Sequence, residues 1–222
     1  MSYAKRTAHP NRPLTARRPA RAPSRSVNRD LRPVAAFRQR GWQADLEVED
    51  FNAPETWHNP TEKPRTRFIV QPAGNGFRHP VTTAEVRERL ALLPARFTRE
   101  LEVVQFSGMT RKRQLFPCYG MQWGASVYLY PMEESFVEIY RRPPTPQQQI
   151  EARMFGGRWT NDRKLWRLTW TEQTIKDFYL NNVLIHEVGH LNDARNTNSH
   201  NRERFANWFA IEYGYRATRQ AK

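Results

Sequence analysis

The sequence predicts an α+β protein in which a small antiparallel or mixed sheet packs on two helices near the end of the chain. Short apolar segments, some with the alternation typical of strands, occur between residues 101 and 170. After them, apolar residues recur at helical spacing in residues 171–194 and again in residues 201–214. Strands grouped together and then followed by helices are typical of the α+β class.

Three regions of the chain differ in composition. Residues 1–40 hold eleven Lys/Arg and one acid, so they carry +10 of the net charge of +14. We expect them to form a disordered basic arm. Residues 41–80 contain an acidic cluster followed by several prolines, and we expect a Pro-rich, weakly ordered linker. Residues 81–222 have the pattern of a globular domain.

The first element expected in this domain is a helix that begins near residue 82. Thr82 and Glu85 have the spacing of a capping box, and apolar residues follow at helical intervals. Pro94 is expected to end the helix.

Strands are expected next, and the apolar segment 101–106 has the character of a buried strand. Residues 124–132 alternate apolar and aromatic side chains, and we expect them to pair as a hairpin with residues 135–140. A loop then leads into a short helix within residues 143–155. A turn separates Trp159 from a last strand at residues 165–170.

Two helices are expected at the end of the chain. The first covers residues 171–194 and contains Gly189, although glycine inside a helix costs about 1 kcal/mol relative to alanine. A close approach of another element would explain that glycine. The second helix covers residues 201–214, and Gly214 is expected to cap its end.

The first of these helices contains the sequence HEVGH, with His186, Glu187 and His190. Residues four apart on a helix lie on one face, with Cβ atoms about 5–6 Å apart, so both imidazoles can bind one metal ion. Glu187 lies about 100° around the helix and is placed to act as a general base. We therefore predict one catalytic zinc ion.

A catalytic zinc site needs a third protein ligand, and we favour Glu203 at the start of the last helix. His200, in the preceding loop-like segment, is the alternative metal ligand. Asp193 lies about 10 Å along the helix from His186, too far to share the ion easily with both histidines. It is expected to support the ligands without binding the metal itself. Asn207, one turn after Glu203, is expected to orient a ligand histidine by a hydrogen bond.

The pair of motifs HEVGH and ERFANWFA (203–210) resembles the signature of gluzincin metallopeptidases, and is most similar to the ImmA/IrrE-like and minigluzincin branch. The resemblance implies a zincin-like fold, zinc on His186, His190 and Glu203, and Glu187 as catalytic base. It also implies an edge strand that holds an extended substrate, at residues 124–131 or 135–140.

This sequence departs from the family pattern in the spacer between His190 and Glu203, which has only 12 residues. A rival alignment to SprT-like metalloproteases would place His200 as the third ligand instead.

The function predicted from these motifs is that of a zinc metalloendopeptidase, a hydrolase acting on a peptide or protein substrate. The alternative is a non-proteolytic or regulatory zinc-fold protein that docks on nucleic acid or a partner through residues 1–40.

The remaining features concern location and regulation. There is no apolar run long enough for a membrane span and no secretory signal, so we expect a cytoplasmic protein, while organelle or nucleoid targeting by the basic arm stays open. The single cysteine, Cys118, makes no internal disulfide. We interpret it as a small apolar residue, and the alternative is a thiolate that fills the fourth zinc position.

Overall fold

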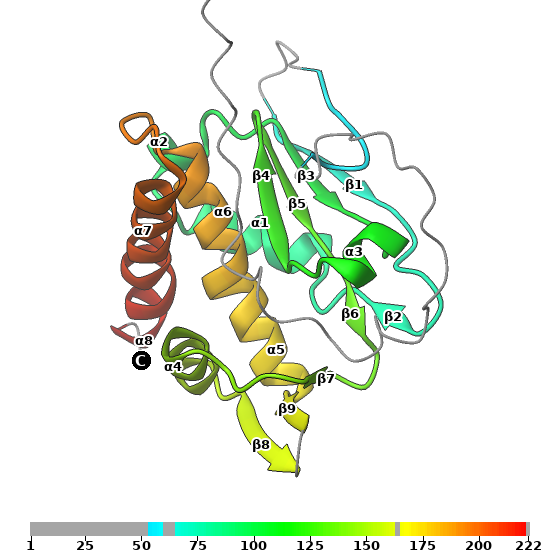
Figure 1. Ribbon diagram of the computed structural model, residues 1–222. Coiled ribbons are helices and arrows are strands. Elements are labelled where there is room, and N and C mark those ends of the chain that lie inside the picture. Colours follow the sequence, from blue (N-terminus) through cyan, green and yellow to red (C-terminus); the bar gives the residue numbers. More distant parts are fainter. Residues whose placement is uncertain (1–52, 60–64, 163–164, 221–222) are drawn as a thin grey trace, which may run out of the picture.

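The computed structural model describes residues 53–59, 65–162 and 165–220, and they form an α+β structure. A four-stranded mixed sheet packs against helices, and the two long helical segments at the end of the chain lie side by side (Figure 1). A smaller three-stranded sheet lies near the start of the first of these segments (Figure 1). The general α+β class predicted from the sequence is confirmed.

The larger sheet has the strand order β1-β3-β5-β4. The first three strands in this order are parallel, and β4 is antiparallel to β5. The bounds are β1 Arg67–Val70, β3 Val103–Phe106, β5 Ser126–Leu129 and β4 Gly120–Trp123. The sheet is therefore mixed, with β4 at one edge.

The position of β5 corrects one expectation about the substrate-binding strand. Residues 124–131 were expected at an edge, but β5 is paired on both sides, by β3 and by β4. The edges of this sheet are β1 and β4, and β4 was not predicted from the sequence because it is short and contains a glycine. The other predicted segment, residues 135–140, does contain an edge strand, but it belongs to the three-stranded sheet.

The smaller sheet is antiparallel, with the strand order β7-β9-β8. Its strands are β7 Val137–Tyr140, β8 Arg158–Asp162 and β9 Leu165–Thr169. The predicted hairpin between residues 124–132 and 135–140 is therefore wrong. The chain leaves β5 to form β6 (Met132–Glu133), which pairs with β2 (Phe77–Arg78), and a turn with positive φ at Phe136 redirects it before β7.

Side-chain caps begin several helices. Thr82 caps α1 in the predicted capping box with Glu85. Thr145 and Thr171 cap α4 and α5 in the same way, because each hydroxyl accepts from the third backbone N–H of its helix. The bounds are α1 Thr83–Ala91, α2 Ala95–Thr98, α3 Arg111–Leu115, α4 Pro146–Met154 and α5 Glu172–Phe178.

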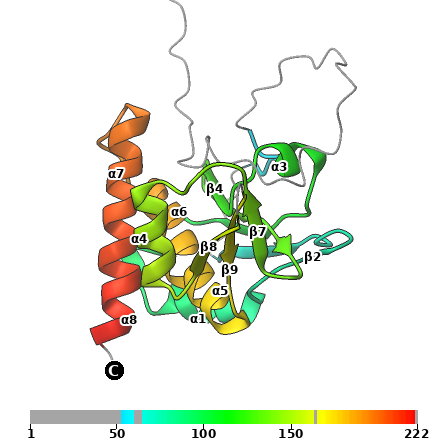
Figure 2. The same cartoon turned by 60° about the horizontal axis from the view of Figure 1, so that its bottom comes forward.

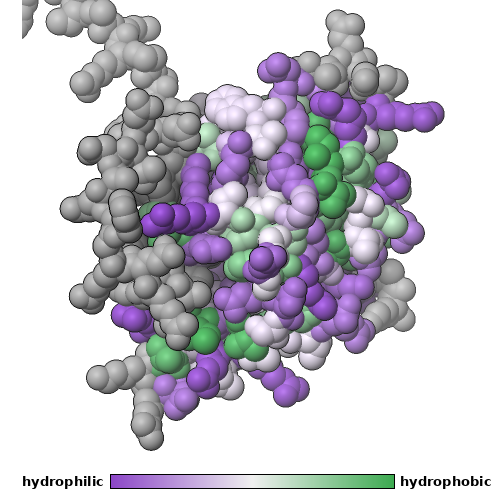
Figure 3. Space-filling model, turned by 90° about the vertical axis from the view of Figure 1, so that its right-hand side faces the viewer, coloured by the Kyte–Doolittle hydropathy of each residue, from purple (hydrophilic) through white to green (hydrophobic). Residues whose placement is uncertain are grey.

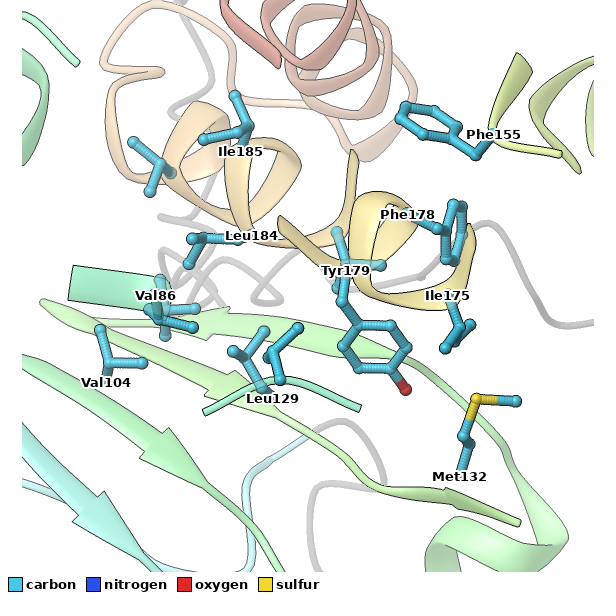
Figure 4. Packing of buried hydrophobic residues seen from close by; sticks show 14 of the residues in the cluster. Val86, Val104, Leu129, Met132, Phe155, Ile175, Phe178, Tyr179, Leu184 and Ile185 are labelled. Carbon is cyan, nitrogen blue, oxygen red and sulfur yellow. The ribbon is translucent and has the colours of Figure 1, made fainter. Parts of the chain in front are cut away.

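The helix α5 continues without a break through a π turn, η2 (Tyr179–Val183), into α6 (Leu184–Leu191). One side of this segment packs on the sheet and on α1, and Figure 4 shows Leu184 directed toward Val86 and Ile175 toward Met132, with the Tyr179 ring between them. Each of these residues is almost fully buried. Burial of this apolar surface stabilises the fold and fixes the position of α6 relative to the sheet.

The last helical segment runs from α7 (Ser199–Phe209) through the π segment η3 (Ala210–Arg216) to α8 (Ala217–Gln220). Gly214 does not end the helix, so the predicted cap is wrong. A Cβ on Gly214 would lie 1.9 Å from the carbonyl oxygen of Asn181. The glycine is needed because two helices approach each other closely there, and the backbone stays helical.

Part of the region expected to be a weakly ordered linker is folded. Strand β1 belongs to the larger sheet, β2 pairs with β6, and residues 53–59, here called the strap, pack on the sheet. The ordered structure thus begins before the expected boundary at residue 81. The basic arm, residues 1–40, lies outside the described residues.

The face that carries β1 and β2 is mostly hydrophilic, with a narrow strip of hydrophobic residues (Figure 3). Among the described residues, none of the helices is both long enough and apolar enough to cross a membrane.

Candidate metal centre

His186 and His190 lie one turn apart on α6 and face Glu203 on α7. The Nε2 atom of His186 is 3.4 Å from Oε2 of Glu203, and Nε2 of His190 is 3.5 Å from Oε1. One candidate ligand atom from each of the three residues lies within 4.8 Å of the others. The three side chains are only 12–18% exposed, so the cluster is shielded yet reachable from solvent.

Gly189 allows the two helices to approach each other. A Cβ at this position would lie 3.0 Å from Cα of Ala206 and 3.0 Å from Cβ of Phe209. The close approach that the sequence analysis inferred from a glycine inside the helix is therefore present. This close packing of α7 on α6 places Glu203 opposite the two histidines.

Two buried atoms of this cluster lack a hydrogen-bond partner. They are Nδ1 of His190 and Oε2 of Glu203. A buried polar atom without a partner costs about 1–3 kcal/mol, and a charged one costs more. A cation bound between the imidazoles and Glu203 would satisfy the carboxylate oxygen, so the donor set fits a metal ion.

The two imidazoles have opposite pKa shifts. Burial, together with the positive charges of His186 and Arg202, lowers the pKa of His190 to about 3, so this ring is neutral and can offer a lone pair. Burial also lowers the pKa of His186, but the Glu203 carboxylate 3.4 Å away and the charges of Glu187 and Glu151 outweigh burial and leave it above its ordinary value. A metal ion would compete with protons for both imidazoles, so its binding would weaken as the pH falls.

Glu187 is buried on the side of α6 that faces β4. Burial raises the pKa of its carboxyl group to about 7, although the charge of His186 and a hydrogen bond from the backbone N–H of Gln122 act in the opposite direction. Gly120 makes room for this side chain, since a Cβ there would lie 3.0 Å from Cγ of Glu187. A carboxyl group with a pKa near 7 is suited to both accepting and donating a proton at neutral pH.

The structure separates the two candidates for the third ligand. Glu203 belongs to the cluster, whereas His200 is exposed on the first turn of α7 and is not part of any metal-binding group found among the described residues. The short spacer after His190 is compatible with this arrangement, because α7 begins at Ser199 and turns Glu203 toward α6.

Among the described residues, the side chains of the two residues expected to support the ligands make no hydrogen bond to the side chains of His186, His190 or Glu203. Asp193 is buried, and its carboxylate accepts hydrogen bonds from the backbone and side-chain amides of Asn196, so it stabilises the turn after α6. Asn207 is half-buried, and the hydrogen bond expected between it and a ligand histidine is absent from the described part of the chain. Nδ1 of His190, a buried atom that such a bond could satisfy, has no partner.

Sequence reasoning did not identify Glu151 and Arg202, which lie close to the centre. Glu151 is on α4, which lies beside the last helical segment of the chain in both views of the ribbon (Figures 1 and 2). Burial raises the pKa of Glu151, while the charge of His186 lowers it and that of Glu203 raises it. Arg202 donates to the carbonyl oxygen of His190 at 3.3 Å and to the side chain of Gln122 at 3.5 Å. No local motif marks these contacts, because they form between elements distant in sequence.

Cys118 does not reach the cluster. Its thiol contacts the guanidinium of Arg113 at 3.3 Å, and burial raises its pKa to about 11 despite that positive charge. A thiol with such a pKa is protonated at neutral pH, and Cys118 is not among the residues whose ligand atoms come together in the cluster. The interpretation of Cys118 as a small packed residue is therefore favoured over that of a zinc ligand.

The chain was compared with protein-family models, with curated proteins and with solved structures, and none of them matches it. The function must therefore be argued from the geometry of the centre.

Proposed function

We propose that the protein is a zinc-dependent metallopeptidase of the gluzincin type, with Glu187 as the general base. The observation that carries this proposal is the convergence of His186, His190 and Glu203 from two helices, with an unpartnered carboxylate oxygen between them. Glu187 follows the first ligand directly in the chain and is held on the neighbouring side of α6.

The donor set favours zinc over harder cations. Calcium and magnesium prefer sites made entirely of oxygen ligands, whereas two imidazoles and one carboxylate are a common catalytic zinc set. Three protein ligands leave one position open in a tetrahedral site, which a catalytic centre needs.

A bound zinc ion would polarise the scissile carbonyl and make the attacking water more acidic. The chain itself supplies the proton transfer. Glu187 would accept a proton from the attacking water and then donate it to the leaving amine nitrogen, as the new C–O bond forms and the amide C–N bond breaks.

The edge strand β4 is the best-placed element to bind an extended substrate. It lies beside Glu187, and its outer side has no strand partner among the described residues. A peptide that adds to a sheet edge gains main-chain hydrogen bonds independent of its sequence. This assigns to β4 the part expected of residues 124–131 or 135–140.

The test compares the wild-type protein with Glu187→Gln. We expect the wild type to cleave an unfolded protein substrate when loaded with zinc and to lose this activity after chelation. Glu187→Gln should bind zinc with unchanged affinity and show no turnover, because the amide cannot accept the proton. Zinc-loaded wild-type protein that cleaves no peptide bond would contradict the proposal, as would a Glu187→Gln variant of normal activity.

A further inference from the structure

Two tryptophan rings lie together at the end of β4. Trp57, in the strap, contacts Trp123 edge-on with a distance of 5.3 Å between ring centroids. Trp57 is 63% exposed, which leaves a large apolar surface in water. One exposed apolar residue is common in soluble proteins, but a pair of indoles beside an unpaired sheet edge marks a contact surface.

Hydrogen bonds on both sides of Trp57 hold its backbone in place. Tyr128 donates its hydroxyl to the carbonyl oxygen of Thr56 at 2.9 Å, and the ring of His58 is bonded to Gln105 at 2.7 Å. The strap is thus attached on either side of the exposed ring. An aromatic side chain held in this way loses little conformational entropy when it binds a partner.

The main chain of β4 alternates between the sheet and the free edge. Tyr130 donates its N–H to the carbonyl of Tyr119, so these residues form a hydrogen-bonded pair. In an antiparallel ladder such pairs alternate, so the main-chain groups of Gly120 and Gln122 point away from β5. The contact of the Gln122 N–H with Glu187 agrees with this alternation.

The side chains of β4 alternate between the two faces of the sheet. Gly120 faces Glu187 on α6, whereas Trp123 lies on the opposite face with the strap. A peptide strand paired with β4 would follow the same alternation, so every second side chain would point away from the metal centre. Cβ atoms of directly opposed residues are about 4.5–5.5 Å apart, which brings one such side chain onto the indoles.

We propose that Trp57 and Trp123 bind a large apolar side chain of the peptide substrate and thereby set its sequence preference. The proposal rests on the proposed function, because it takes β4 as the strand that holds the substrate. The contact is apolar, and it lies on the face of the sheet opposite Glu187. It therefore selects the substrate without taking part in proton transfer.

The first experiment measures the cleavage profile. Wild-type protein, Trp57→Ala and Trp57→Phe are loaded with zinc and incubated with a mixture of peptides, and the new termini are identified by mass spectrometry. We expect large apolar residues to be enriched at one fixed position from the cleaved bond. Trp57→Ala should reduce this enrichment about tenfold, and Trp57→Phe should largely restore it. Trp208→Ala, at an exposed tryptophan on α7, is the matched control and should leave the profile unchanged.

The second experiment measures peptide retention in the Glu187→Gln background, which needs no turnover. Immobilised Glu187→Gln protein should retain apolar peptides from the same mixture, and the double variant with Trp57→Ala should not. If the wild type cleaves nothing but retention depends on Trp57, the proposed function fails, and the binding of an apolar peptide side chain at Trp57 and Trp123 stands without the role in substrate preference. If the wild type cleaves with the same profile as Trp57→Ala, or if retention does not depend on Trp57, the inference is overturned.

Discussion

The carboxylate of Glu203 faces two imidazole nitrogens, and one of its oxygens is buried without a hydrogen-bond partner. In the absence of a cation this arrangement costs free energy, which a bound metal ion would recover. Glu203 is therefore the expected third ligand, and it is also the residue of α7 whose carboxylate contacts both histidines of α6.

The first prediction concerns this residue. Glu203→Ala should lower the affinity for zinc by more than about a hundredfold, because it removes a ligand and not merely a group that orients one. His200→Ala should leave the affinity unchanged, since His200 is exposed and outside the cluster. Competition with a chromogenic chelator measures both. Loss of zinc in His200→Ala together with full retention in Glu203→Ala would reverse the ligand assignment.

At the scale of single residues, the sequence was enough to predict the functional groups that lie close together in the chain. The spacing of His186, Glu187 and His190 was enough to predict one helix face with a flanking base. It could not reveal that Gly120 makes room for Glu187 or that Arg202 contacts Gln122, because these contacts depend on how β4 lies against α6 and α7.

At the scale of helices and strands, the close contact between α6 and α7 depends on Gly189. Gly189→Ala would improve intrinsic helix propensity by about 1 kcal/mol, yet its Cβ would press against Ala206 and Phe209. We expect a net destabilisation of about 1–3 kcal/mol and a weaker metal site, because the two helices must separate.

The comparison is Gly214→Ala, whose Cβ would press against Asn181 at the other end of the same helix pair. Both variants should melt at lower temperature. Only Gly189→Ala should show a reduced rise in melting temperature on adding zinc. Equal zinc-induced shifts in the two variants would contradict the role assigned to Gly189.

The strap depends on an ion pair between Glu55 and the buried Arg113, with 2.7 Å between Oε1 and Nε. Burial raises the pKa of Glu55, but the charge and hydrogen bonds of Arg113 outweigh it, and the pKa lies below its ordinary value. A lowered pKa in the folded state means that the stabilisation is complete above the unfolded pKa, about 4.3. It is lost as the pH falls through the folded pKa.

Glu55→Gln should therefore lower the free energy of unfolding by about 1–3 kcal/mol at neutral pH, because Arg113 stays buried without its partner charge. The difference from the wild type should shrink as the pH falls below about 4. Denaturant unfolding at several pH values measures it. Glu100→Gln is the control, since Glu100 pairs with Arg99, both side chains are mostly exposed, and the pair should contribute less than about 1 kcal/mol. A Glu55→Gln effect that does not change with pH would contradict the assignment.

The elements themselves were more predictable than their pairing. Capping residues and apolar spacing located α1 and the two closing helices, and the loop-like sequence before it located the short helix α4, because those signals are local. The partner predicted for β7 was wrong, since strand pairing depends on long-range packing and on the turn at Phe136. The strap was missed for the same reason, as its hydrogen bonds reach residues about 50–75 positions away.

For the whole molecule, charge is distributed unevenly along the chain. Residues 41–222 hold 25 basic and 21 acidic groups, a net charge of +4, whereas residues 1–40 carry +10. Because non-specific affinity for nucleic acid follows the number of phosphates neutralised, deletion of residues 1–40 should lower it at least about tenfold at low salt.

Zinc binding and peptide cleavage should survive this deletion, since every residue of the candidate centre lies in the described part of the chain. Binding measured at several salt concentrations, with and without residues 1–40, tests the expectation. Cleavage lost together with nucleic-acid binding would favour the alternative of a protein that docks through its arm.

The geometry of the candidate metal centre depends on the number of residues in the π turn η2. A π turn closes its hydrogen bonds over one residue more than an α turn does. Each residue advances the helix by about 100°. The number of residues in η2 therefore sets how far the metal-facing side of α6 is rotated about the helix axis from the sheet-facing side of α5. Loss of a single residue within Tyr179–Val183 would rotate both imidazoles away from Glu203 without altering any ligand. Chains with the same HEVGH letters but a different length in this turn should therefore not assemble the same centre.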